Sequence, residues 1–171
     1  NSTTNTTYYI PSTLKNVTIT GGNILYGAFY NCSSLTSIEL PNGITSIGNS
    51  AFYNCRGLTS IEIPDSVTSI GAYAFSGCSG LTITRLEISS NVRYIGCGAF
   101  SGWKNLISIT LPFVGAKAGL TSSDTYQYPF GYIFGTESYD GGVATTQYYY
   151  GSSTNSTTNT TYYIPSTLKN V

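Results

Sequence analysis

The chain has 171 residues, with seven basic side chains, seven acidic ones, and no His or Met. This length is enough for one domain with a sizeable core, whereas the sparse, balanced charge is a poor footprint for nucleic acid or an anionic membrane. Without His, the Ser-His-Asp and Cys-His nucleophile systems and His-ligated zinc are excluded, so we expect no enzyme activity. No apolar run approaches the roughly 18 residues of a membrane span.

A short repeat of 23 residues begins near the amino terminus and runs through the first two thirds of the chain. After a polar run at 1–7 and an apolar triplet at 14–19, the motif Ala-Phe-x-x-Cys occurs three times, and Ala-Phe-Ser-Gly-Trp follows at the same register. The four motifs lie at 28–32, 51–55, 74–78 and 99–103. An apolar triplet after each motif predicts a short strand, and Pro41, Pro64 and Pro112 end three of these strands because proline cannot continue a ladder.

Near-copies in register predict coils that stack and share one core, since no single coil can bury its own apolar side chains. We therefore expect a mainly β repeat solenoid, in which each coil has one short parallel strand, a second extended piece and a short helical turn. Strands of successive coils should pair at roughly 4.8 Å. The whole chain, 1–171, is predicted to be one solenoid segment. It is regular over about 14–112 and irregular over about 113–163, where 130–135 reads as a degenerate coil.

The repeated pattern A-F-x-x-C-x-x-L-T-S-I-x-I-P-x-x-V-T-S-I-G-x-x resembles a known family. It looks like the 23-residue unit of the BspA-like leucine-rich repeats of bacterial and some protist surface proteins. The resemblance is specific over 14–112 and loose over 113–163. It implies a curved solenoid, a secreted or cell-surface location, and adhesive or binding roles, with no catalytic residues to carry over.

A longer repeat joins the two ends of the sequence. Residues 1–17 and 155–171 both read NSTTNTTYYIPSTLKNV, at an offset of 154. We expect the chain to be a window from a long tandem array of 154-residue units, uncapped at both ends; a single protein with a duplicated terminal segment is the alternative. Division of 154 by 23 predicts between six and seven coils, and therefore an advance of about 30 Å, for each unit.

Six asparagines lie in Asn-x-Ser/Thr sequons: Asn1, Asn5, Asn16, Asn31, Asn155 and Asn159. We expect N-linked glycans in the cluster at Asn1 and Asn5, because no core residue there obstructs a bulky sugar. Asn31 is less favourable, since it adjoins the inward Cys32. O-linked sugars on the neighbouring Ser and Thr, or a simple solvated loop, are the alternatives.

Three cysteines fall at the same point of successive coils, at Cys32, Cys55 and Cys78, and Trp103 takes that place in the fourth. This register predicts a buried ladder of reduced thiols, because parallel side-chain vectors suit a disulfide poorly. A bridge between Cys78 and Cys97 is the alternative in an oxidising compartment. We expect no metal site, since the chain has neither a C-x-x-C pair nor His.

Glu39, Glu62 and Glu87 occupy the same outward strand position in three coils and predict an acidic stripe. Stacked carboxylates repel one another unless cations or Arg screen them, and Arg85 is close in sequence to Glu87. Binding of a calcium ion by these carboxylate oxygens is the alternative, but a hydrated acidic stripe is favoured and no cofactor is expected.

Nine of the sixteen tyrosines lie between Tyr126 and Tyr163. An amphipathic ring can cover an irregular coil while its hydroxyl meets water, so we expect intrachain packing in this region. Contacts with sugars or with a neighbouring strand of a fibre are the alternatives.

Together these features predict a structural segment of a long extracellular, glycosylated tandem-repeat protein that forms fibres, filaments or stalks. Its partner would be itself, as consecutive units of one polypeptide or by head-to-tail stacking, which gives open filaments. We favour the covalent form because sequence identity across the boundary needs chain continuity. The alternative is a cell-surface adhesin whose concave sheet, with its acidic stripe, binds a host protein or glycan, although likeness of fold is a weak basis for function.

Overall fold

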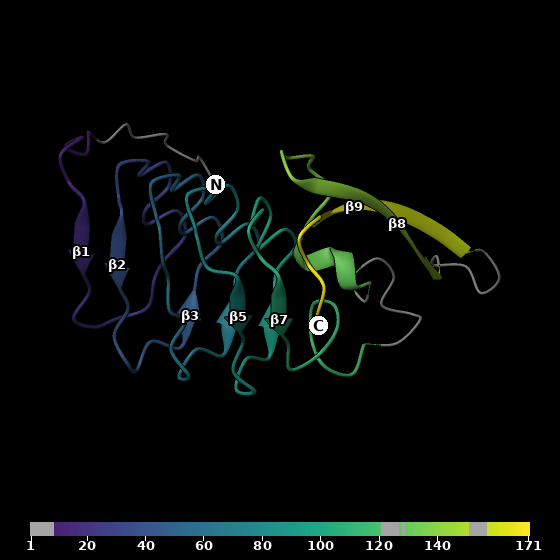
Figure 1. Ribbon diagram of the computed structural model, residues 1–171. Coiled ribbons are helices and arrows are strands. Elements are labelled where there is room, and N and C mark those ends of the chain that lie inside the picture. The colour runs from purple at the N-terminus through teal and green to yellow at the C-terminus, as the bar shows by residue number, and fades with distance from the viewer. Residues whose placement is uncertain (1–8, 121–126, 128, 151–156) are drawn as a thin grey trace, which may run out of the picture.

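The computed structural model describes residues 9–120, 127, 129–150 and 157–171. The short strands β1 to β7 belong to stacked coils, and the long β8–β9 hairpin extends beyond one end of the stack (Figure 1). The elements are β1 (Asn16–Thr18), β2 (Ser37–Glu39), β3 (Ser46–Ile47), β4 (Ser69–Ile70), β5 (Arg85–Glu87), β6 (Tyr94–Ile95), β7 (Ser108–Thr110), η2 (Phe130–Ile133), β8 (Gly142–Tyr150) and β9 (Thr157–Pro165).

The short strands pair in parallel with the equivalent strands of neighbouring coils, as a stacked solenoid requires. β1 pairs with β2, β5 pairs with β7, and β3, β4 and β6 form a second ladder. In this second ladder Ile47 lies opposite Ile70, and Ile70 lies opposite Ile95. The predicted mainly β solenoid is confirmed, with the addition that the second extended piece of each coil also pairs.

A series of backbone hydrogen bonds joins each coil to the one before it, next to the strands β1, β2, β5 and β7, which form the first ladder. The carbonyl of Lys15 accepts the N–H groups of Thr36 and Ser37, at 2.7 and 3.1 Å. The carbonyl of Ile107 accepts those of Lys169 and Asn170 in the same way, at 2.8 and 3.2 Å. The links are Lys15 to Thr36, Thr36 to Thr59, Thr59 to Thr82, Thr84 to Ile107, and Ile107 to Lys169.

These links give five coil-to-coil steps between Lys15 and its counterpart Lys169, and not the six to seven expected from division. The difference arises in the last step, because the chain between Ile107 and Lys169 makes a long excursion that includes η2 and the β8–β9 hairpin. At about 4.8 Å for each step, the 154-residue unit advances about 24 Å, and the expected value of about 30 Å is too large.

Threonine hydroxyls reinforce the same chain of hydrogen bonds. The hydroxyl of Thr36 donates to the Lys15 carbonyl at 3.0 Å, that of Thr59 to the Thr36 carbonyl at 3.1 Å, and that of Thr82 to the Thr59 carbonyl at 3.2 Å. A carbonyl has two lone pairs, so each can accept a backbone and a side-chain donor together. Part of the abundant Ser and Thr therefore holds the coils to one another.

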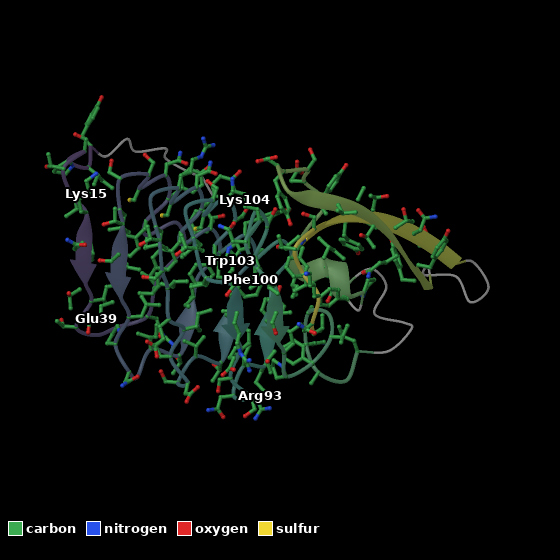
Figure 2. The ribbon with its side chains drawn as sticks, in the orientation of Figure 1. Lys15, Glu39, Arg93, Phe100, Trp103 and Lys104 are labelled. Carbon is green, nitrogen blue, oxygen red and sulfur yellow. The ribbon has the colours of Figure 1, made fainter. Side chains whose placement is uncertain are left out.

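The core is one continuous column of apolar side chains, with stacked phenylalanines at its centre. The rings of Phe29, Phe52, Phe75 and Phe100 follow one another with centroid distances of 5.2, 5.2 and 6.2 Å and planes within 5° of parallel. Figure 2 shows Phe100 in the interior of the coils, whereas Arg93 lies at their outer edge. Burial of each such ring stabilises the fold by roughly 1.5 to 3 kcal/mol.

The Ala-Phe-x-x segments form short hydrogen-bonded turns; the N–H of Cys32, for example, donates to the Phe29 carbonyl three residues earlier, at 3.1 Å. The residue before each Cys or Trp has a left-handed backbone, with φ of 59°, 57°, 74° and 85° at Asn31, Asn54, Gly77 and Gly102. Asn and Gly tolerate this region best, which explains their exchange at this position.

The part of the chain that the structure describes contains no helix with the length and apolar character of a membrane span.

Residues 130–135 add a further layer to the stack before the hairpin. The N–H of Phe100 donates to the Ile133 carbonyl at 3.0 Å, as that of Phe75 donates to the Ala99 carbonyl at 2.9 Å. The nine-residue strands β8 and β9 pair antiparallel, which the sequence analysis did not predict. Tyr162 from β9 is 1% exposed and belongs to the core, so the hairpin is fixed to the solenoid.

Candidate functional site

The three acidic residues of the predicted stripe have different local settings. Glu39 lies in β2 and Glu87 in β5, whereas Glu62 lies outside the described strands, although all three are exposed. Glu39 and Glu62 line a shallow polar depression of about 540 Å³, and Glu87 is not among its lining residues. No group of three or more His, Cys, Asp or Glu within the described ranges is arranged to hold a metal ion.

The third coil has two extra residues at its hydrogen-bond links to the neighbouring coils. Thr82 makes the hydrogen bond to the preceding coil, whereas Thr84, two residues later, accepts the bonds from the following coil. Glu39 and Glu62 both follow their linking threonine by three residues, but Glu87 follows Thr82 by five. Counted from Thr84, however, Glu87 follows by the same three residues, and it lies opposite Thr110 of β7.

Arg85 neutralises Glu87, as the sequence suggested. The Arg85 Nη2 atom lies 2.8 Å from Glu87 Oε1, and Nε donates to the same oxygen at 2.9 Å. Both side chains are about two-thirds exposed, so the ion pair contributes at most about 1 kcal/mol. With Glu87 occupied, Glu39 and Glu62 are the two carboxylates that remain as a candidate ligand surface.

All four cysteines are free, and the three of the ladder are buried. The thiol of Cys55 donates to the Phe29 carbonyl and that of Cys78 to the Phe52 carbonyl, both at 3.1 Å. Trp103 Nε1 donates to the Phe75 carbonyl at 3.1 Å, so the indole replaces the thiol in the same hydrogen bond. The ladder thus satisfies carbonyl groups inside the core.

We expect alkaline pH to destabilise the fold through these thiols. Burial, with a smaller contribution from Cys32, raises the pKa of Cys55 to about 12, and burial raises the pKa of Cys78 as well. The unfolded thiols ionise near pH 8.5, so their contribution to stability is fully present below that pH and is lost as the pH rises towards the folded pKa. Urea unfolding at about pH 7.5 and about pH 10.5 measures this loss. A Cys55→Ala, Cys78→Ala chain is the control, and an equal loss in both chains would contradict the assignment.

Three sequon asparagines lie in the described part of the chain, and all three are exposed: Asn16, Asn31 and Asn159. The side-chain oxygen of Asn16 accepts a hydrogen bond of 2.7 Å from the Ser37 hydroxyl. This bond leaves Nδ2, the atom that carries an N-linked glycan, on the other side of the amide. The remaining sequons, at Asn1, Asn5 and Asn155, lie outside the described residues.

A groove lined by tyrosines was not predicted from the sequence. It has a volume of about 510 Å³, and Tyr26, Tyr30, Tyr53 and Tyr73 contribute to its lining. The rings of Tyr30 and Tyr53 stack at 5.0 Å, because both follow the Phe of the repeated motif. This shared register was the signal in the sequence.

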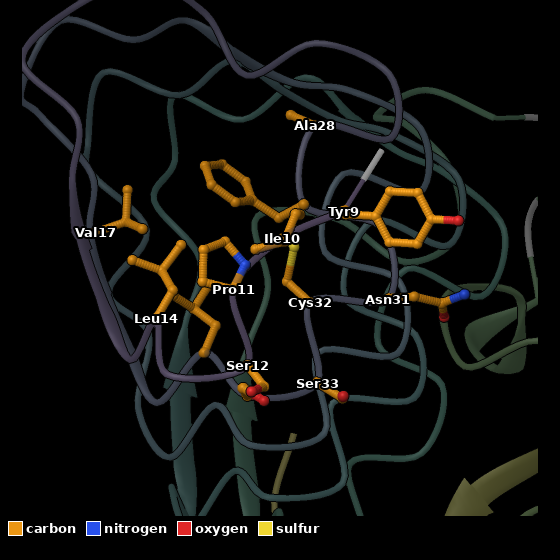
Figure 3. A pocket seen from close by; sticks show the side chains of 13 residues that line it. Tyr9, Ile10, Pro11, Ser12, Leu14, Val17, Ala28, Asn31, Cys32 and Ser33 are labelled. Atoms are coloured by element: carbon orange, nitrogen blue, oxygen red, sulfur yellow. The ribbon is translucent and has the colours of Figure 1, made fainter. Parts of the chain in front are cut away.

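A second pocket, of about 480 Å³, opens at the start of the solenoid. It lies between the first coil, with Pro11 and Leu14, and the second, with Phe29, Cys32 and Leu35 (Figure 3). Its lining is mostly apolar, because the first coil leaves one side of the core open. This pocket is a continuation of the hydrophobic core.

Several bacterial proteins of known structure are similar to the chain. A leucine-rich repeat protein from Bacteroides ovatus is 32% identical with a TM-score of 0.51, over 57% of this chain and 25% of that one. A leucine-rich repeat protein from T. pallidum is 29% identical with a TM-score of 0.50, over 61% of each chain. A leucine-rich cell surface protein from Faecalibacterium prausnitzii is 32% identical with a TM-score of 0.45, over 59% of this chain and 34% of that one.

The chain thus spans about a quarter of the first relative's length and about three fifths of the second's. No curated protein sequence matches it. Six copies of the BspA type leucine-rich repeat region are recognised within residues 2–119, more than half of the chain. These copies include the stacked coils described above. The chain therefore belongs to the BspA-type leucine-rich repeat family.

Proposed function

We propose that the chain is a structural segment of an extracellular protein in which 154-residue units follow one another in tandem and build a filament or stalk. The observation that carries the proposal is the place of the second seventeen-residue copy. Lys169 and Asn170 bond to the coil of β7 with the same pattern by which Thr36 and Ser37 bond to the coil of β1. The repeated sequence thus continues the stack of coils, with no change of direction.

Glycosylation is the second part of the proposal. The exposed positions of Asn16, Asn31 and Asn159 support it, because a glycan at each would project into solvent. An extracellular location agrees with these sequons and with the resemblance to surface proteins. With only 8% charged residues, the surface depends on hydroxyls and sugars for its hydration. The proposal assigns the chain no reaction.

Electron microscopy of the native source tests the filament. We expect uniform thin filaments with an axial repeat of about 24 Å, which is five coil spacings, and extra density beside the sequon asparagines. Discrete globular or short curved particles would contradict the proposal.

The adhesin alternative rests on the depression between Glu39 and Glu62. A Glu39→Gln, Glu62→Gln chain separates the two functions, because the substitutions remove charge and keep side-chain shape. The filament proposal predicts unchanged filaments. The adhesin alternative predicts loss of binding to a host protein or glycan.

A further inference from the structure

The repeated seventeen-residue segment lies in two different settings, and each setting covers the part that the other leaves open. In the first copy Tyr9 is 94% exposed and Leu14 40% exposed, whereas Val17 packs against the core. In the second copy Leu168, the counterpart of Leu14, packs against the core, whereas Val171 is 72% exposed. The identical sequences differ in their neighbours: the first copy has a following coil, whereas the second has a preceding coil and the strand β8.

The first copy shows the contacts with the coil that follows. The Lys15 carbonyl accepts the N–H groups of Thr36 and Ser37, and the Asn16 side-chain oxygen accepts the Ser37 hydroxyl. Val17 lies opposite Ile38 in the parallel pair of β1 and β2. This side of the segment thus uses a carbonyl, a side-chain amide oxygen and an apolar side chain.

The second copy shows the contacts with the coil that precedes. The N–H groups of Lys169 and Asn170 donate to the Ile107 carbonyl, and the Asn170 carbonyl accepts the Ile109 N–H at 3.1 Å. The hydroxyl of Thr167 lies 2.7 Å from the Leu106 carbonyl, to which it donates. Pro165, the counterpart of the exposed Pro11, is buried.

Among the contacts of the described residues in the two copies, no group is used on both sides. The following coil takes the carbonyl of the Lys residue and the side chain of the Asn residue, whereas the preceding coil takes the N–H groups of both and the backbone carbonyl of the Asn. We infer that a single copy of the segment makes both sets of contacts at once, between consecutive units of the same sequence. The units then join without a linker, through one continuous sheet and core. This inference rests on the proposed tandem array and specifies its junction.

The open pocket at the start of the solenoid fits this junction. Its lining includes Tyr9, Ile10, Pro11 and Leu14 (Figure 3). Their counterparts in the second copy are buried or partly buried. Three of them, Tyr163, Ile164 and Pro165, lie in β9 and pair with β8, and β9 also contacts η2. The layer of η2 and β8 of the preceding unit is the occupant that closes the pocket.

Thiol labelling measures the junction. The test compares the present chain with a two-unit chain, in which residues 18–171 follow Val171 a second time. Val171→Cys is introduced at the same place in both chains, and Lys169→Cys is the matched control because Lys15 and Lys169 are both exposed. We expect a maleimide to react with the Val171→Cys thiol about tenfold or more slowly in the two-unit chain, where the following coil covers it. The control thiol should react equally fast in both.

Equal labelling of the Val171→Cys thiol in the two chains would overturn the inference. A second measurement is independent of the new thiol: the unsubstituted two-unit chain should unfold in one transition at a higher temperature than the one-unit chain, since repeat stability grows with each shared interface. Two separate transitions, or an unchanged midpoint, would also overturn it. Filaments in the native source together with equal labelling would leave the proposed function intact and show that the units are flexibly joined.

Discussion

Replacement of Phe75 by alanine is expected to lower the free energy of unfolding by about 3 to 5 kcal/mol. The ring is fully buried, stacks on Phe52 at 5.2 Å and on Phe100 at 6.2 Å, and meets the indole of Trp103 edge to face at 6.1 Å. Its removal leaves a cavity between coils that cannot approach each other, because their backbones are already hydrogen-bonded. Urea unfolding followed by circular dichroism measures the loss.

Tyr26→Ala is the control for this substitution. Tyr26 is 77% exposed, so its loss should change the free energy of unfolding by no more than about 0.5 kcal/mol. A Phe75→Ala effect as small as that of the control would show that the phenylalanine column is not the centre of the core. The Phe75→Ala chain can also populate a partly unfolded intermediate, in which the coils on one side of the substitution are unfolded. Such an intermediate agrees with a central role of the phenylalanine column, because repeat proteins depend on contacts between neighbouring coils.

Repetition is the reason that the regular coils could be predicted in detail. Because the same register recurs, the equivalence of Cys55, Cys78 and Trp103 could be read from the sequence alone. The structure explains that equivalence, because each of the three side chains donates a hydrogen bond to the carbonyl of the motif phenylalanine in the preceding coil. The register predicted a buried side chain at this position, but it did not reveal that the side chain also donates a hydrogen bond to a core carbonyl.

The hairpin and the acidic stripe show where the register stops being informative. β8 and β9 are rich in threonine and tyrosine, residues with high strand propensity, but no repeat indicated which segment each would pair with. In the coil of Glu87, two inserted residues divide the linking role between Thr82, which bonds to the preceding coil, and Thr84, which bonds to the following one; the spacing of the apolar residues could not show this. Tertiary contacts determine which strands pair and how an insertion is accommodated, and a single sequence does not state those contacts directly.

Substitution of Gly71 by alanine should also be strongly destabilising, by about 3 kcal/mol. The glycine ends the Thr-Ser-Ile-Gly motif at a corner where the backbones of adjacent coils meet. A Cβ atom on Gly71 would lie 2.6 Å from the Gly48 carbonyl carbon, well inside van der Waals contact. The Asn49 side-chain oxygen, which accepts the Ala72 N–H at 2.9 Å, is equally close. Movement of that side chain would not relieve the clash with the backbone, which is held by the hydrogen bond from the Gly71 N–H to the Ile47 carbonyl at 2.8 Å.

Gly21→Ala is the matched control, because a Cβ atom at Gly21 would meet nothing within 4 Å and the backbone there is not left-handed. That substitution should leave the free energy of unfolding unchanged or raise it by up to about 1 kcal/mol. If Gly71→Ala were as well tolerated as Gly21→Ala, the coils would have to stand further apart at this corner. A wider spacing would lengthen the axial repeat beyond five strand separations, so the tolerance of one glycine bears directly on the filament that we propose.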